Sequence, residues 1–124
     1  MMRMLRLVFC IRKLSDVDEA AFRRHWRETH APIVQGLSDA LRLRRYVQSH
    51  TSHKEFNDAL VEGRGMAATY DGIAEVWWDS LKTAVEAMNS PAGQEANKWL
   101  IQDEGRFVDL SRCTAFITEE HVIF

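Results

Sequence analysis

His30 is the residue of this chain best placed for acid–base chemistry. It lies four residues after Trp26, near the apolar stripe of a predicted helix, and shortly before Pro32. An imidazole titrates near neutral pH, so it can accept and return a proton under ordinary conditions. The alternative is a structural role, in which His30 bonds backbone carbonyls at the end of a helix that Pro32 interrupts. Both interpretations stay open here, and His30 is the first catalytic candidate.

Three further catalytic candidates lie on two segments that we predict to be neighbouring strands. Tyr46, Gln48 and His50 share one strand face, because side chains alternate with a two-residue repeat. Glu75 lies in the next strand along the chain. A hydrogen-bonded set of Tyr46, His50 and Glu75 could remove a proton next to a carbonyl group and stabilise the resulting enolate. We predict that these side chains face one cavity, which His30 approaches from the helix end.

Glu75 stands between apolar neighbours, and its burial would be costly without a partner. Burial would favour its protonated form, whereas pairing with Arg6 or Arg12 would favour the carboxylate. Arginines on a cavity-facing strand would also favour an anionic substrate. The predicted substrate-binding residues are Trp77, Phe116, Arg6, Arg12 and His25.

Metal binding has little support in the sequence. His25 and His30 are five residues apart, which places them about 140° apart around an α-helix rather than on one face. His50 and His53 stand at a strand end without a cysteine or carboxylate cluster. We therefore predict no metal site.

Other chemistries lack their motifs. The sequence has neither a glycine-rich phosphate loop nor a serine nucleophile elbow. RNA recognition modules share the element order proposed below, but their third strand carries basic and aromatic residues. Here that strand reads GIAEVWWD, with acidic residues in their place. We predict no nucleic-acid partner.

The elements that position these residues follow from the apolar periodicity. Strand-like runs alternate with helical patterns in the order β-α-β-β-α-β, the ferredoxin-like α+β arrangement of one antiparallel sheet with helices on one face. We expect Pro32 to end or interrupt the first helix, with one more short turn at 33–40. We expect the polar connection 51–69 to hold one helical turn near 55–61. We expect strands at 4–11, 43–50, 72–78 and 113–118, with helices at 16–29, from 81 and from 91 to about 104.

The second sheet face is the feature that predicts a homodimer. Leu5, Leu7, Phe9 and Ile11 suit the helix layer, but residues 72–78 are apolar on both faces. A sheet that is apolar on both sides needs a second cover, and a two-fold copy of the chain is the simplest one. The space between two such sheets would form a barrel pocket for a small apolar organic ligand.

Composition fits one soluble domain spanning 1–124. The chain is 46% hydrophobic and 27% charged, with a formal net charge of -2. We expect a cytoplasmic protein without a signal peptide or membrane span. Cys10 and Cys113 are expected to be buried thiols, with a disulfide between paired strands as the less favoured alternative.

Several segments together resemble the EthD family, named for ethyl tert-butyl ether degradation. They are FRRHWRETHAP at 22–32, RYVQSH at 45–50, YDGIAEVW at 70–77, and Asp103-Glu104 followed by Phe107. The resemblance covers most of the chain, and 51–69 matches least. It implies a dimeric α+β barrel and suggests the degradation of xenobiotics. Relatives of this fold include cofactor-independent monooxygenases, lactone isomerases, polyketide cyclases, decarboxylases and haem-binding enzymes.

Two functions are compatible with these observations. The first is a small enzyme, an oxidoreductase, isomerase or lyase, that acts without a metal or other cofactor on an apolar oxygenated compound. The second is a non-catalytic accessory or carrier protein that binds haem or another hydrophobic ligand.

Overall fold

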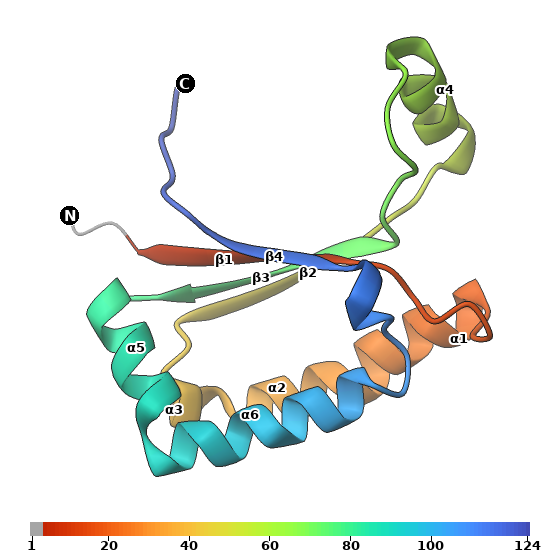
Figure 1. Cartoon of the computed structure of the whole chain (residues 1–124). Coiled ribbons are helices and arrows are strands. Elements are labelled where there is room, and N and C mark those ends of the chain that lie inside the picture. The colour runs from red at the N-terminus through yellow and green to blue at the C-terminus, as the bar shows by residue number, and fades with distance from the viewer. Residues whose placement is uncertain (1–3) are drawn as a thin grey trace.

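The computed structural model describes residues 4–124 and has a ferredoxin-like α+β fold, as the sequence predicted. The four strands form one antiparallel sheet in the order β2-β3-β1-β4 (Figure 1). Residues 1–3 lie outside the described residues. Within the described residues, no helix is long and apolar enough to cross a membrane. The strands are β1 (Leu5–Ile11), β2 (Arg45–His50), β3 (Gly72–Trp78) and β4 (Thr114–Thr118).

Pro32 does not end the first helical segment, but the segment changes its bonding pattern just before the proline. The Asp18 carboxylate caps its start by accepting from the Ala21 N–H at 2.7 Å. A π-helical stretch comes directly before the proline, and its wider i→i+5 bonding accommodates a residue that has no N–H to donate. The segment comprises α1 (Glu19–Arg24), the π-helix η1 (His25–His30) and α2 (Ala31–Gly36).

Serine residues cap the two helices that follow β3. Ser80 and Ser90 accept hydrogen bonds from first-turn amides, and Pro91 takes the first position of its helix. The connection 51–69 holds a longer helix than the single turn we expected. The remaining elements are α3 (Ser38–Leu41), α4 (Lys54–Arg64), α5 (Leu81–Asn89), α6 (Pro91–Glu104) and the short 3-10 helix η2 (Leu110–Arg112).

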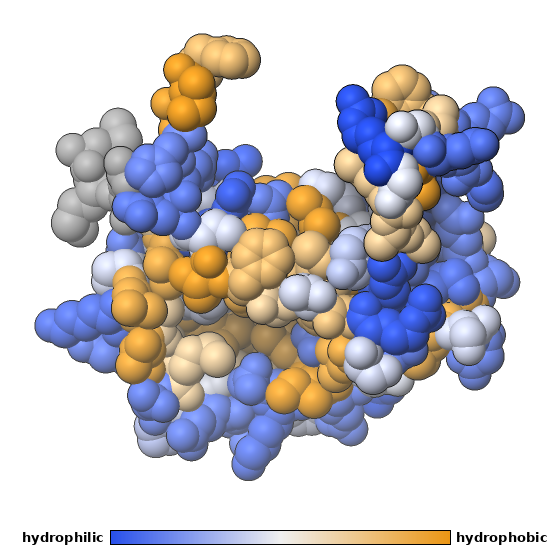
Figure 2. Space-filling model, turned by 45° about the horizontal axis from the view of Figure 1, so that its top comes forward, coloured by the Kyte–Doolittle hydropathy of each residue, from blue (hydrophilic) through white to orange (hydrophobic). Residues whose placement is uncertain are grey.

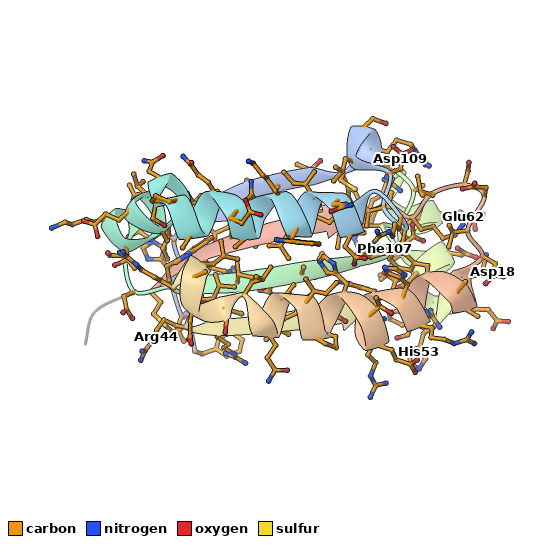
Figure 3. All side chains as sticks on the ribbon, turned by 90° about the horizontal axis from the view of Figure 1, so that it is seen from below. Asp18, Arg44, His53, Glu62, Phe107 and Asp109 are labelled. Atoms are coloured by element: carbon orange, nitrogen blue, oxygen red, sulfur yellow. The ribbon has the colours of Figure 1, made fainter. Side chains whose placement is uncertain are left out.

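Helices cover one face of the sheet, with α1 to α2 and α6 lying side by side along it (Figures 1 and 3). Phe22, Trp26 and Phe107 are each 1% exposed and form the centre of the core with Ile11 and Val108. Along α5 and α6, the hydrophobic residues that are fully buried are all small. Ala84, Ala87 and Ala96 are buried, whereas Leu81, Val85, Met88 and Trp99 are exposed.

Strand register decides which side chains share a face. Tyr46 lies opposite Val76, which lies opposite Leu7 on the helix side of the sheet. Val47 and Val8 both lie opposite Glu75 on the other side. The prediction for β1 is confirmed. The prediction that Tyr46, Gln48 and His50 share a face with Glu75 is wrong, because these residues point towards the helices.

Candidate active site

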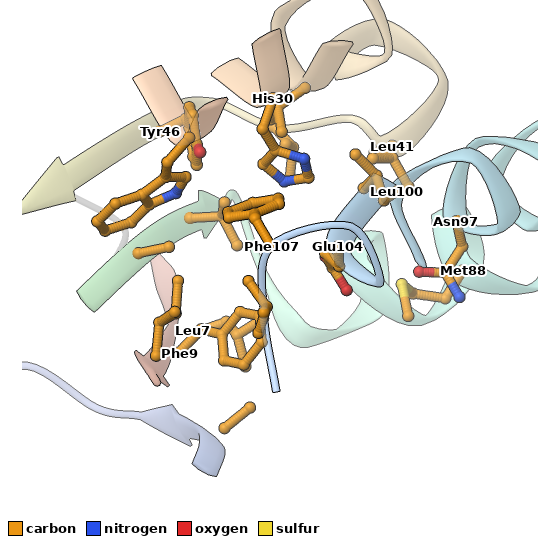
Figure 4. A pocket seen from close by; sticks show the side chains of 18 of the residues that line it. Leu7, Phe9, His30, Leu41, Tyr46, Met88, Asn97, Leu100, Glu104 and Phe107 are labelled. Atoms are coloured by element: carbon orange, nitrogen blue, oxygen red, sulfur yellow. The ribbon is translucent and has the colours of Figure 1, made fainter. Parts of the chain in front are cut away.

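A mostly apolar pocket of about 240 Å³ lies between the sheet and its helices. We expected the pocket between the sheets of two chains, but this cavity is built within one chain. Figure 4 shows Tyr46, His30 and Glu104 arranged around Phe107, with Leu7 and Phe9 beneath them. A few polar groups in an apolar wall are typical of a small-molecule site. The polar residues of the lining are His30, Tyr46, Asn97 and Glu104.

His30 reaches this cavity from η1 and pairs with a buried carboxylate. Its Nδ1 lies 2.8 Å from Oδ2 of Asp103, and the two residues are 6% and 1% exposed. Asp103 lies near the C-terminal end of α6, so the pair joins two helices. A carboxylate at Nδ1 places the ring proton there and leaves Nε2 with its lone pair. Within the described residues, Nε2 of His30 has no hydrogen-bond partner and is free to meet a ligand.

The π-helix brings a second histidine to the same carboxylate. Nε2 of His25 lies 3.1 Å from both oxygens of Asp103, and Nη1 of Arg106 lies 3.2 Å from Oδ1. Our argument that His25 and His30 could not share a face assumed α-helical spacing. In a π-helix, i→i+5 bonding places residues five apart nearly over one another. His25 therefore contacts Asp103 and does not line the cavity as a substrate-binding residue.

The electrostatics of this cluster favour a neutral imidazole beside a charged carboxylate. Burial lowers the pKa of His30, against the opposing effect of Asp103. Burial alone would raise the pKa of Asp103, but its hydrogen bonds with His30, His25 and Arg106 outweigh burial and lower it. At neutral pH, His30 is therefore an unprotonated base held by an ionised partner.

Glu104 supplies an acid to the pocket, whereas His30 supplies a base. Burial, with a smaller contribution from the neighbouring charge of Asp103, raises the pKa of Glu104 to about 7. Among the described residues, its carboxyl has no hydrogen-bond partner. A carboxylic acid that keeps its proton near neutral pH can act as a general acid.

Tyr46 reaches the cavity from β2. Burial raises its pKa, while hydrogen bonds with the side chains of Gln48 and Trp26 act in the opposite direction. Gln48 donates to the Tyr46 oxygen at 2.8 Å, and Nε2 of His50 lies 2.8 Å from Oε1 of Gln48. His50 itself stacks on Trp26, with ring centroids 4.2 Å apart, and does not line the cavity.

The other predicted site residues lie on the opposite, uncovered face of the sheet. Glu75 pairs with Arg6 at 2.9 Å, and Arg6 also donates to Thr118. Trp77 and Phe116 share this face, as their register with Arg6 and Val8 shows. Figure 2 shows apolar side chains gathered on the sheet between the C-terminal tail and α4. The structure therefore separates Glu75, Arg6, Trp77 and Phe116 from the cavity that holds His30 and Tyr46.

Arg12 has a structural role at the end of β1. Its guanidinium donates to the carbonyls of Thr69 and Ala68 and lies 4.1 Å from the centre of the Tyr70 ring. Arg12 thus fastens the segment that follows α4, and it does not line the cavity.

Asp103 and Glu104 are the functional candidates that our sequence reasoning missed. We used them for the family resemblance and assigned them no role. One signal was present, because Asp103 continues the helical spacing of Ala96, Leu100 and Phe107, which places a carboxylate on the buried stripe. Buried carboxylates need partners, and His30 was available.

Groups of three or more His, Cys, Asp or Glu side chains that could hold a metal ion do not occur among residues 4–124. Cys10 and Cys113 are both free thiols and only partly buried, so the disulfide alternative is wrong.

The fold and the cavity define the class of protein: a ferredoxin-like α+β domain with acid–base groups between its sheet and its helices. The EthD domain model matches residues 14–111, most of the chain. The chain therefore belongs to the EthD family. None of the curated proteins compared with the chain matches it.

Solved structures share this fold at low sequence identity. An ethyl tert-butyl ether degradation (EthD) family protein from Bacillus halodurans is 20% identical, with a TM-score of 0.63 over 95% of this chain and 99% of that one. A dimeric ferredoxin-like protein of unknown function from Thermobifida fusca is 14% identical, with a TM-score of 0.55 over 94% and 90%. A hydroxynitrile lyase from Passiflora edulis is 11% identical, with a TM-score of 0.56 over 98% and 99%.

Proposed function

We propose that this chain is an enzyme that moves protons on a small, largely apolar molecule bearing a carbonyl group. The observation that carries the proposal is the buried His30–Asp103 pair, which leaves one imidazole nitrogen free at the wall of an apolar cavity. A neutral imidazole oriented by a carboxylate is the usual arrangement of a general base.

The cavity residues divide into three roles in the proposed reaction. Nε2 of His30 takes a proton from the carbon next to the carbonyl. The electron pair of that C–H bond forms the carbon–carbon double bond of the enolate, and the π pair of the carbonyl moves onto its oxygen. Tyr46 stabilises the resulting enolate by donating a hydrogen bond to that oxygen. The protonated Glu104 returns a proton to carbon, and His30 then restores the proton of Glu104. The net change is an isomerisation or exchange that needs no further reactant.

Two comparisons support catalysis on this fold. The family takes its name from ethyl tert-butyl ether degradation, and one structural neighbour is a hydroxynitrile lyase. Proton transfer next to a carbonyl is a step that isomerases, lyases and cyclases share.

Haem is not part of the proposal. Cavities that bind drug-sized ligands measure roughly 300–1,000 Å³. The cavity of about 240 Å³ lies below that range, and a porphyrin is larger than most drug-sized ligands. The cavity as it stands therefore fits a smaller molecule.

Hydrogen–deuterium exchange tests the proposal without knowledge of the natural substrate. The purified protein would be incubated in D₂O with acetophenone and with cyclohexanone, and loss of the α-proton NMR signal would be followed. We expect His30→Ala to slow this exchange by about 10²-fold or more, the usual contribution of a general base. Asp103→Asn should also slow it, because the amide no longer fixes the ring proton on Nδ1 and so no longer keeps the lone pair on Nε2.

His53→Ala is the matched control, because His53 is exposed in the segment before α4. It should exchange both ketones at the wild-type rate. Exchange by the wild-type protein that is no faster than exchange by His30→Ala, for both ketones, would contradict the proposed reaction.

We also propose that the protein is a homodimer through its uncovered sheet face. Val8, Val47 and Ile73 lie only partly buried on this face, and Phe116 is 48% exposed. The Thermobifida fusca neighbour is described as dimeric, which supports a second copy as the occupant. Such a dimer would cover the Arg6–Glu75 pair while leaving each cavity within its own chain.

A further inference from the structure

A row of hydrogen bonds on the helix-facing side of β2 holds Tyr46 from behind the cavity. Nε2 of Gln48 lies 2.8 Å from the Tyr46 oxygen and 2.8 Å from the backbone oxygen of Trp26. Nε2 of His50 lies 2.8 Å from Oε1 of Gln48. Gln48 and His50 do not line the cavity, so any effect on a ligand must act through Tyr46.

The carbonyl of Trp26 fixes the direction of every bond in this row. A backbone carbonyl can only accept, so the Gln48 amide must present its nitrogen to Trp26. The two N–H bonds of that nitrogen are then used by Trp26 and by the Tyr46 oxygen. Oε1 of Gln48 faces His50, whose Nε2 must donate to it.

The same logic determines where the Tyr46 hydroxyl proton points. The Tyr46 oxygen accepts from Nε2 of Gln48, a nitrogen that can only donate. No described residue accepts the Tyr46 proton. The remaining direction is the cavity, which Tyr46 lines.

We propose that Gln48 is a positioning residue that makes Tyr46 a hydrogen-bond donor to the ligand, and that His50 holds Gln48 in this orientation. The ligand must therefore present an acceptor oxygen to Tyr46, such as a carbonyl or the oxyanion formed from it. This inference rests on the proposed function, because it specifies the substrate oxygen that the same cavity binds.

The row orients Tyr46 and does not conduct protons. A proton could pass through Gln48 only if its amide changed tautomer, whereas the orientation needs nothing more than the bonds described. Burial, together with the nearby charges of Arg23 and Arg27, lowers the pKa of His50. Both the neutral and the protonated His50 ring can donate from Nε2, so the row persists in either form.

Titration of Tyr46 tests this inference without any substrate. The chain has two tyrosines, so 3-fluorotyrosine labelling gives two fluorine NMR signals, and Tyr46→Phe assigns them. A donor to the phenol oxygen stabilises the phenolate. Gln48→Met removes that donor at similar size, and we expect the titration midpoint of Tyr46 to rise by about one pH unit or more.

Gln48→Glu reverses the direction of the hydrogen bond between residue 48 and Tyr46, and it provides the sharper test. Its carboxylate cannot donate, so Tyr46 would donate to it, and the Tyr46 midpoint should rise further than in Gln48→Met. His50→Phe keeps an aromatic ring on Trp26 but removes the bond to Gln48, and it should raise the midpoint by a smaller amount. The Tyr70 signal should not move in any variant, which confirms that each one is folded.

An unchanged or lowered Tyr46 midpoint in both Gln48 variants would overturn the role of Gln48, and an unchanged midpoint in His50→Phe would overturn the role of His50. The ketone exchange assay separates this inference from the proposed function. A raised midpoint without ketone exchange in the wild-type protein would refute the reaction and retain the orientation of Tyr46. Ketone exchange in the wild-type protein, without a raised Tyr46 midpoint in the variants, would retain the reaction and refute the orientation of Tyr46.

Discussion

Glu104 is the residue whose burial has the clearest consequence for stability. Its pKa is about 7 in the folded protein, against an ordinary value of 4.5, because burial disfavours the charged form. Between these values the folded state holds a proton that the unfolded state has released. Stability is therefore highest below pH 4.5 on account of this group, and it falls as the pH rises to about 7.

Glu104→Gln should remove this loss, because glutamine resembles the protonated acid and does not ionise. We expect the variant to match the wild type near pH 4.5 and to exceed its free energy of unfolding at pH 8 by about 2–3 kcal/mol. Urea denaturation at the two pH values measures the difference.

Glu95→Gln is the control, since Glu95 lies on the exposed side of the same helix. It should show no comparable difference between the two pH values. A Glu104→Gln variant no more stable than the wild type at pH 8 would show that the carboxyl is solvated rather than buried.

At the scale of elements, the junction between α5 and α6 determines where Asp103 and Glu104 lie. Gly93 sits in the first turn of α6, and a Cβ there would come within 1.7 Å of the Ala87 backbone oxygen. Because that neighbour is backbone, the two helices would have to move apart. The close approach permitted by this glycine sets the start of α6, whose far end carries the two carboxylates.

Gly93→Ala should lower the free energy of unfolding by about 3 kcal/mol, since overpacking against backbone cannot be relieved by a side-chain rotation. Thermal and urea denaturation would measure the loss. Gly63→Ala is the matched control, because Gly63 lies in α4 with nothing within 4 Å of the added carbon. It should raise stability by about 0.5 kcal/mol through helix propensity. Equal effects of the two substitutions would contradict the close approach at Gly93.

Sequence patterns predicted some elements better than others for physical reasons. In β1, apolar Leu5, Leu7 and Phe9 alternate with Arg6 and other residues, so the helix-facing side was predicted correctly. In β2 the polar side chains face the helices, since Gln48 satisfies a helix carbonyl and His50 stacks on Trp26. Alternation alone cannot show that polar residues have partners inside the protein.

The π-helix was the second feature that periodicity could not predict. Apolar spacing was analysed with 3.6 residues per turn, which separates His25 from His30. The wider turn brings both rings to Asp103 and permits the helix to continue past Pro32. Among the polar residues that line the pocket, His30 and Tyr46 could be singled out from the sequence, while their hydrogen-bond partners required the three-dimensional structure.

At the scale of the whole molecule, the proposal that two chains associate through the uncovered sheet face can be tested by mutation. Phe116→Glu places a charge on that face, and we expect it to convert a dimer of 14.4 kDa chains into monomers. Sedimentation equilibrium at micromolar concentration measures the change. A charge buried in an apolar interface costs several kcal/mol, so the substitution should strongly disfavour association.

Ile117→Glu provides the comparison, because Ile117 lies next in β4 on the opposite side and is 50% exposed. This variant should remain dimeric. A wild-type protein that sediments as a monomer, or a Phe116→Glu variant that stays dimeric, would rule out the uncovered sheet face as the interface.

The positions of the four tryptophans provide the protein with its own optical reporters. Trp26 and Trp78 line the cavity, so a ligand that enters it should alter their fluorescence. Trp77 lies on the uncovered face beneath the Arg45 guanidinium, where a second chain would change its surroundings. Trp99 is 55% exposed on α6 and should emit at the longer wavelengths of a solvated indole. Single-tryptophan variants would thus follow ligand entry and chain association as separate signals, without any added label.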